Sequence, residues 1–291
     1  MRGQPPLRRT PFSRLLPMTS DQARLRSYID AWTTSVADVV TLLRSLDEQD
    51  WSRPTDLPGW DVRSVAGHLA HLESELAGFD QAPVEVPELA HVRSPMSSYT
   101  ERGPLTRASW AATDIVDELE NAAAARLVEL EADLPSDGSG RPPRTPGDIG
   151  WNWETLLSNR VLDVWMHEQD IRRAVGRPGG MTGPGAAHTV NVFARSFGYC
   201  VGKRVAPPAG TTVVLDVSGV SPVHLAVEVT PEGRAVPMDS DPAEPTVRLA
   251  MDLEAFIVLS GGRRPWREVG VRIDGDQSLG EKVLEALAVT P

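Results

Sequence analysis

Four residues with side chains capable of chemistry share one face of a predicted helix near the middle of the chain. Arg160, Asp163, His167 and Asp170 follow one another at spacings of three and four residues, which places them along one stripe of a helix surface. The residues around them are largely apolar, so this helix is expected to be mostly buried. Asp163 and His167 could offer a carboxylate oxygen and an imidazole nitrogen to one metal ion. The alternative is a satisfied core, in which Asp163 pairs with Arg160 and His167 bonds to a neighbour.

A second predicted helix supplies the further histidine that a metal site needs. This helix begins near Asp61, which can cap it, and carries His68 and His71 on one face. We predict that His68 joins Asp163 and His167 as the ligand set, and that His71 is a neighbour of the site or a structural residue. Two histidines and one carboxylate suit zinc and leave a fourth position open, as in catalytic sites.

The other polar residues of the helix have two interpretations each. Asp170 is placed to accept the free ring N–H of a ligand histidine, or to pair with Arg173 three residues on. Arg160 is placed to hold Asp163 or to contact an anionic substrate. Both alternatives stay open at the level of sequence.

A loop far along the chain carries a candidate substrate-binding residue. Arg263 follows Gly261 and Gly262, which permit a close approach of the backbone to another element. A guanidinium group there is predicted to bind a substrate carboxylate, the alternative being an arginine in solvent. Trp60 and Trp165 are expected to be packing residues.

Hydrophobic periodicity indicates a helical first part. Apolar residues recur every three and four positions in four long segments, which predicts a four-helix bundle. The predicted helices cover residues 20–46, 61–78, 105–134 and 153–175. Residues 81–104 and 135–150 are expected to be loops, the first a candidate flap over the site. The segment 176–185 is rich in glycine and proline and indicates a linker.

The last third of the chain has a different pattern. After a predicted helix over 186–205, residues 223–229 alternate apolar and polar side chains, as in a half-buried strand. Further strands are predicted at 211–218, 246–251 and 269–273, with helices capped by Asp252 and Ser278. The fold class is therefore α+β, with a helix bundle over 18–180 and a small α+β domain over 186–291. Residues 1–17 are expected to be a disordered extension.

Composition excludes several classes of protein. The 291 residues carry a formal net charge of −11, which argues against a nucleic-acid partner. No run of 18 apolar residues occurs, so no membrane span is expected. The single cysteine, Cys200, excludes an intramolecular disulfide and is expected to be a buried thiol. These features predict a cytoplasmic protein and leave its oligomeric state open.

Two stretches resemble the signatures of a known family. The segments 59–70, with Gly59-Trp60 and a histidine eight residues after the tryptophan, and 163–171, with its carboxylate-x-x-x-His, are similar to those of the mycothiol-dependent maleylpyruvate isomerase family, within the DinB-like superfamily. The segments 251–256, 262–263 and 274–276 resemble that family's sterol-carrier-like C-terminal domain. One departure is Asp163, where the family usually has glutamate.

The resemblance implies a DinB-like bundle, a divalent metal that is usually zinc, and the small thiol mycothiol as co-substrate. A thiol at the open metal position loses its proton, and the thiolate is a strong nucleophile. Such a thiolate would isomerise maleylpyruvate by reversible addition, or displace a leaving group as an S-transferase, so the second partner is a small electrophilic or acidic substrate. The alternatives are a metal-dependent hydrolase and a non-catalytic protein that binds a small ligand.

Overall fold

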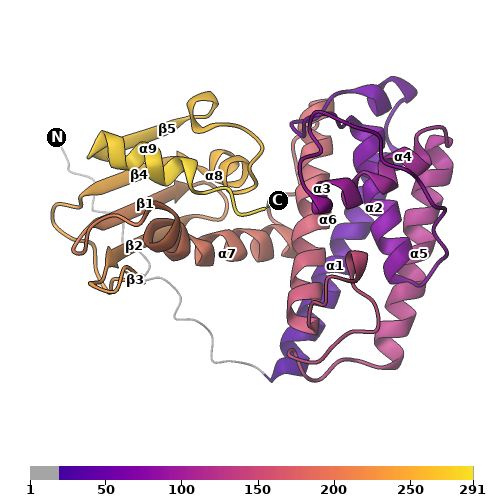
Figure 1. Ribbon diagram of the computed structural model, residues 1–291, viewed down its shortest axis with the longest axis horizontal. Helices are drawn as coiled ribbons and strands as arrows, with labels where there is room; N and C mark the ends of the chain where they lie inside the picture. Colours follow the sequence, from indigo (N-terminus) through magenta and orange to yellow (C-terminus); the bar gives the residue numbers. More distant parts are fainter. Residues whose placement is uncertain (1–19, 291) are drawn as a thin grey trace, which may run out of the picture.

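The computed structural model describes residues 20–290 and has a helical part and a part built on a β-sheet (Figure 1). This mixed architecture confirms the predicted combination of helices and sheet. The extension predicted over residues 1–17 lies outside the described residues. None of the helices in residues 20–290 is long and apolar enough to cross a bilayer.

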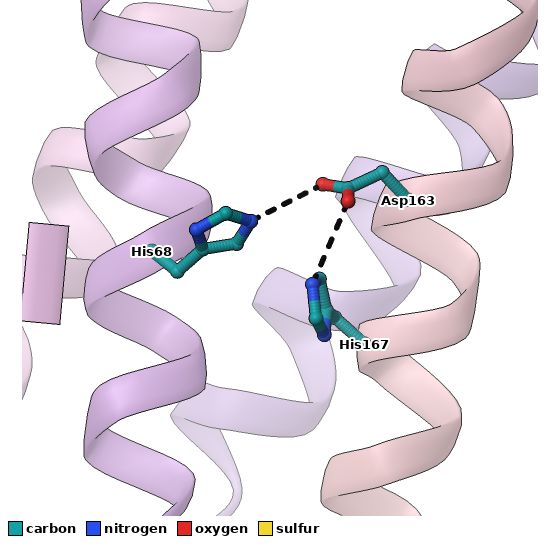
Figure 2. Close-up of side chains that lie close together, drawn as sticks. All are labelled: His68, Asp163 and His167. Carbon is teal, nitrogen blue, oxygen red and sulfur yellow. Dashed lines mark ion pairs between the residues drawn. The ribbon is translucent and has the colours of Figure 1, made fainter. Parts of the chain in front are cut away.

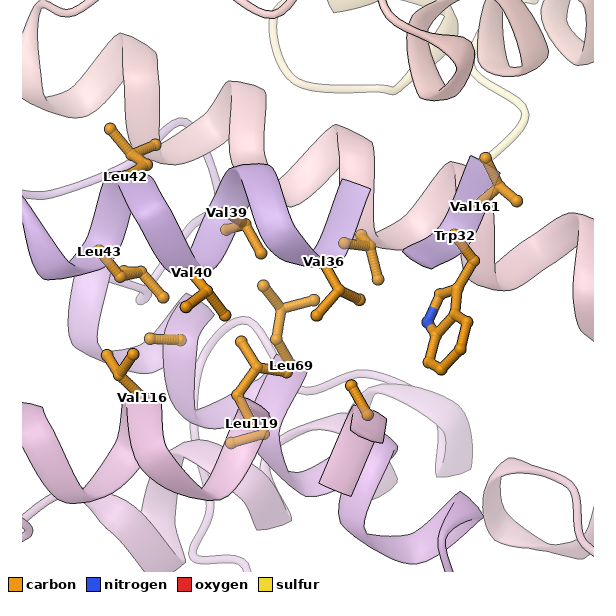
Figure 3. Close-up of a cluster of buried hydrophobic side chains, with 14 of the residues drawn as sticks. Trp32, Val36, Val39, Val40, Leu42, Leu43, Leu69, Val116, Leu119 and Val161 are labelled. Atoms are coloured by element: carbon orange, nitrogen blue, oxygen red, sulfur yellow. The ribbon is translucent and has the colours of Figure 1, made fainter. Parts of the chain in front are cut away.

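Four long helices pack side by side in the helical part: α1 (Asp21–Arg44), α2 (Val62–Leu76), α5 (Ala112–Ala132) and α6 (Trp153–Val175). Each turns its apolar stripe toward a common core, which removes those side chains from water. Figure 3 shows part of that core. The members labelled there include Trp32, Val36, Leu43, Leu69, Leu119 and Val161. Ser20 and Asp61 cap α1 and α2 as predicted, because their side chains accept backbone N–H groups of the first turn.

The connection between α2 and α5 differs from the prediction. The structure has two short helices there, α3 (Pro95–Thr100) and α4 (Arg102–Arg107), and the helix predicted over 105–134 begins only at Ala112. The helical conformation is interrupted at Ala111, whose backbone is extended, and this interruption lets α4 turn back against α2. Gly103 makes the approach possible, since a Cβ there would lie 2.8 Å from the backbone oxygen of Gly67.

The sheet part holds five strands in the order β3-β2-β1-β4-β5. The strands are β1 (Thr212–Ser218), β2 (Val223–Val229), β3 (Ala235–Pro237), β4 (Val247–Asp252) and β5 (Val271–Gly275). β1 and β4 are parallel, and the other neighbours are antiparallel. Alternate apolar residues of these strands form one core with three helices, α7 (Pro184–Tyr199), α8 (Leu253–Ser260) and α9 (Gln277–Glu285). Cys200, just after α7, is buried in this core as predicted.

Short helical turns complete the chain: η1 (Glu48–Ser52), η2 (Pro146–Asp148), η3 (Cys200–Val205) and η4 (Trp266–Glu268). Asp252 caps α8 as predicted. The cap predicted at Ser278 is wrong, because the side chain of Asp276 accepts the backbone N–H of Leu279 and α9 begins at Gln277. An aspartate two residues earlier thus satisfies the first turn.

Helix α6 contributes to both cores. Val161 and Val164 face the helical core, whereas Trp165 and Met166 pack in the core of the sheet part. The loop after α8 lies against this second face, since a Cβ at Gly261 would be only 2.4 Å from the terminal methyl carbon of Met166. That contact brings the loop carrying Arg263 beside the helix that carries the predicted ligands.

Candidate metal centre

The three predicted ligands come together between α2 and α6 (Figure 2). His68 projects from α2 toward Asp163 and His167, which lie one turn apart on α6. Nε2 of His68 lies 3.6 Å from Oδ2 of Asp163, and Nε2 of His167 lies 3.6 Å from Oδ1 of the same carboxylate. One donor atom from each residue lies within 4.8 Å of the other two.

This spacing is compatible with a metal ion held between the three side chains. Two ligand atoms bound to a tetrahedral zinc at about 2.0–2.1 Å lie about 3.4 Å apart. The observed separations of 3.6 Å, each to a different oxygen of the Asp163 carboxylate, are close to that value and are too long for good hydrogen bonds. Both imidazoles are buried, while the Asp163 side chain keeps 21% of its surface exposed. Solvent therefore reaches the three potential ligands at the Asp163 carboxylate.

Arg160 stabilises the ionised form of Asp163. Its Nη1 donates to Oδ2 of Asp163 at 2.8 Å, and its Nε and Nη2 donate to Glu73 at 3.0 and 2.8 Å. Burial alone would raise the pKa of Asp163, but the positive charge of Arg160 and the two neighbouring histidines together outweigh it and hold the pKa well below its usual value. The carboxylate is thus ionised at neutral pH, as a metal ligand must be.

His68 is held as a neutral ring. Burial lowers its pKa, and the nearby Asp163 carboxylate only partly offsets this effect. The ring of Trp60 packs against it with 5.0 Å between ring centroids, and also lies 6.1 Å from the ring of His167. Nδ1 of His68 is buried and has no hydrogen-bond partner among residues 20–290. A neutral imidazole retains the lone pair that binds a metal.

His167 is oriented by a carboxylate on its own helix. Its Nδ1 lies 3.1 Å from Oδ2 of Asp170, so we assign the ring proton to Nδ1 and the lone pair to Nε2, which faces Asp163. Burial alone would raise the pKa of Asp170, but the charge of Arg263 and the hydrogen bonds from His167 and Arg263 together outweigh it and lower the pKa. Asp170 therefore accepts the ring N–H as a carboxylate.

The structure resolves the two alternatives for Asp170 and Arg160. Asp170 takes both predicted partners, since Oδ2 contacts His167 and Oδ1 accepts from Nη2 of Arg173 at 2.6 Å. Arg160 is fully buried between Glu73 and Asp163, which matches the structural role rather than contact with a substrate. Both contacts of the satisfied-core alternative are therefore present, since Asp163 pairs with Arg160 and His167 bonds to Asp170, and the same two residues also belong to the three-residue cluster.

The remaining candidate residues are His71, Arg263 and Trp165, and each has other contacts. His71 is buried with Nδ1 2.8 Å from Oε1 of Gln81, and it is outside the cluster. Arg263 lies beside the site, but its guanidinium faces Asp170, with Nε 3.0 Å from Oδ1 and Nη2 2.8 Å from Oδ2. Binding of a substrate carboxylate by Arg263 stays a prediction. Trp165 is a packing residue as expected.

Sequence reasoning missed the buried acid behind the site. Glu73 is fully buried on α2 and accepts hydrogen bonds from Trp32, Arg126 and Arg160. The only signal in the sequence was a carboxylate on a helix whose other neighbours are mostly apolar. Such a residue requires a buried cation, and here two arginines from different helices supply it.

Comparison with known proteins agrees with the mixed fold of helices and sheet. Residues 32–172 match the family model described as the mycothiol maleylpyruvate isomerase N-terminal domain, and residues 187–282 match the MDMPI C-terminal domain. The two models together cover most of the chain. No curated protein matches it.

Two solved structures match this chain, and the first of them shows a similar fold. One is a crystal structure of the mycothiol-dependent maleylpyruvate isomerase, with 17% identity, 87% of this chain and 95% of that chain covered, and a TM-score of 0.52. The other is a single-residue variant of that enzyme, with 16% identity, the same coverage of both chains and a TM-score of 0.49.

These findings define first a protein of mixed helices and sheet, with a possible metal site between two of its helices. The two family models then show the more specific relationship. The chain belongs to the mycothiol-dependent maleylpyruvate isomerase family, which is a family of enzymes. The resemblance read from segments 59–70 and 163–171 is thereby confirmed.

Proposed function

We propose that the protein is a mycothiol-dependent isomerase or S-transferase that holds one divalent metal ion, most simply zinc, through His68, Asp163 and His167. The observation that carries this proposal is the convergence of the three side chains, whose donor atoms lie within 4.8 Å of one another. Nε2 of each histidine lies 3.6 Å from one oxygen of the Asp163 carboxylate. Family membership supports the dependence on mycothiol and the class of reaction.

A bound metal of this kind would supply a positive charge that stabilises the deprotonated form of a thiol. The chain's own residues prepare the site for it. Burial keeps His68 neutral, Asp170 orients the ring of His167, and Arg160 favours the ionised form of Asp163. The Trp60 ring packs against both imidazoles and limits the access of water from its side. The exposed edge of Asp163 leaves an approach for the co-substrate.

The remaining parts of the proposal concern the wider architecture. We regard residues 18–180 as a DinB-like four-helix bundle and residues 186–291 as a sterol-carrier-like domain, supported by the packing of α1, α2, α5 and α6 and by the five-stranded sheet. A cytoplasmic location fits a protein that uses a low-molecular-weight thiol. The second substrate would be a small electrophilic or acidic molecule.

The direct test is turnover of maleylpyruvate by the purified protein, measured with mycothiol, without thiol, and with 2-mercaptoethanol. We expect formation of fumarylpyruvate that requires mycothiol. A second arm offers mycothiol with an aryl halide, and conjugation without isomerisation would identify an S-transferase. Equal rates with and without mycothiol in both arms would contradict the proposal and favour a hydrolase or a binding protein.

A further inference from the structure

We propose that Arg263 is a positioning residue for the metal centre, which acts through Asp170 on the ligand His167. The sheet part of the protein thereby sets the metal affinity of a site whose ligands all belong to the helical part. This inference rests on the proposed metal site and adds to it a residue that does not touch the ligands. It also gives Arg263 a role other than binding a substrate carboxylate.

The first step is the contact between the two parts. Nε of Arg263 donates to Oδ1 of Asp170 at 3.0 Å and Nη2 donates to Oδ2 at 2.8 Å, so the guanidinium binds the carboxylate through two parallel hydrogen bonds. A bidentate pair fixes the plane of the carboxylate as well as its distance. The partners are 93 residues apart in the sequence, and Asp170 has no exposed surface.

The second step is the orientation of Arg263 itself. Its Nη1 donates to the backbone oxygen of Gly261 at 2.6 Å and to Oγ1 of Thr290 at 3.3 Å. The Thr290 hydroxyl in turn donates to the same Gly261 oxygen at 2.8 Å. All three nitrogens of the guanidinium therefore have acceptors in the protein, and only 5% of the side chain is exposed. A group so fully engaged is suited to holding Asp170.

The third step connects Asp170 to the ligand. Oδ2 accepts both the Nη2–H of Arg263 and the Nδ1–H of His167, so one oxygen joins the arginine to the imidazole. A carboxylate in this position fixes the ring orientation and the tautomer of a metal-binding histidine. Arg173 binds the other oxygen, Oδ1, at 2.6 Å and lies on the same helix as Asp170. Of the three residues that bind Asp170, Arg263 is thus the one that belongs to the sheet part of the protein.

The test compares zinc affinity, by competition with a chromophoric chelator, in the full-length parent and in Arg263→Ala, Arg263→Lys and Arg264→Ala. Arg264 is a matched control, because it lies next in the chain and forms another ion pair with the helical part, at 2.9 Å to Asp56. We expect Arg263→Ala to bind zinc about ten- to hundredfold more weakly. Arg263→Lys should recover part of the loss, since an ammonium group keeps the charge but not the bidentate geometry. Arg264→Ala should match the parent.

A spectroscopic measurement separates positioning from general destabilisation. Cobalt(II) replaces zinc in each folded variant, and the absorption bands of the ion report its ligand geometry. We expect altered bands in Arg263→Ala and parental bands in Arg264→Ala. Unchanged zinc affinity and unchanged bands in Arg263→Ala, with a raised KM for the acidic substrate, would overturn the inference and return Arg263 to substrate binding. A parent without zinc affinity would overturn the proposed metal site as well, which distinguishes the two failures.

Discussion

Arg160 joins the candidate ligand Asp163 to the buried Glu73, with Nη1 2.8 Å from Oδ2 of Asp163 and Nη2 2.8 Å from Oε1 of Glu73. The guanidinium is fully buried and favours the ionised form of both carboxylates, together with Arg126 in the case of Glu73. Asp163 therefore meets a cation on one side even before any metal binds. This arrangement explains how an acidic ligand can be kept ionised among apolar side chains, and it gives two tests.

The first prediction concerns the carboxylate of Asp163. Asp163→Glu should retain metal, because it keeps the carboxylate and introduces the residue that the family resemblance implies at this position. Asp163→Asn keeps a similar shape but loses the negative charge, and should bind zinc at least about tenfold more weakly in a chelator competition. Equal affinity in Asp163→Asn and the parent would place this carboxylate outside the ligand set.

The second prediction concerns stability. Glu73→Gln leaves Arg126 and Arg160 buried without their shared negative charge, so the free energy of unfolding of the metal-free protein should fall by about 3–5 kcal/mol in urea titrations. The matched control is Asp117→Asn, which breaks an exposed pair with Arg44 and should cost less than about 1 kcal/mol. Equal losses of unfolding free energy in the two variants would show that the buried cluster contributes no more to stability than an exposed ion pair.

The third prediction is a pH dependence located in the sheet part. His224 lies 2.6 Å from Asp216 and 2.6 Å from Asp241, and Arg248 binds the same two carboxylates. Burial lowers the pKa of His224, but the hydrogen bonds to the two carboxylates outweigh it and raise the pKa above its usual value of about 6.5. The folded protein therefore binds this proton more tightly than the unfolded chain does.

The stability that His224 contributes is complete below about pH 6.5 and is lost as the pH rises through the raised pKa. Urea unfolding of the parent and of His224→Gln across this range should show the parent losing its advantage toward alkaline pH. Parallel pH profiles would mean that the proton on His224 contributes nothing to folding.

Whether the sequence predicted a feature depended on how far apart in the chain the interacting residues lie. Asp163 and His167 were found because a helix places residues four apart on one face, and His68 because its spacing from Trp60 resembled a known pattern. The contact of Arg263 with Asp170 was missed, because it depends on how two parts of the chain dock. The break at Ala111 was missed because the apolar periodicity continues through it, and only the packing of α4 on α2 requires a turn.

The most direct test of the metal centre is metal content by elemental analysis of the parent, His68→Ala and His167→Ala. His224→Gln serves as a control that removes a histidine from the sheet part. We predict about one divalent ion per chain in the parent and in the control, and little metal in the other two variants, with unchanged helix content by circular dichroism. Full metal occupancy in His167→Ala would contradict the account.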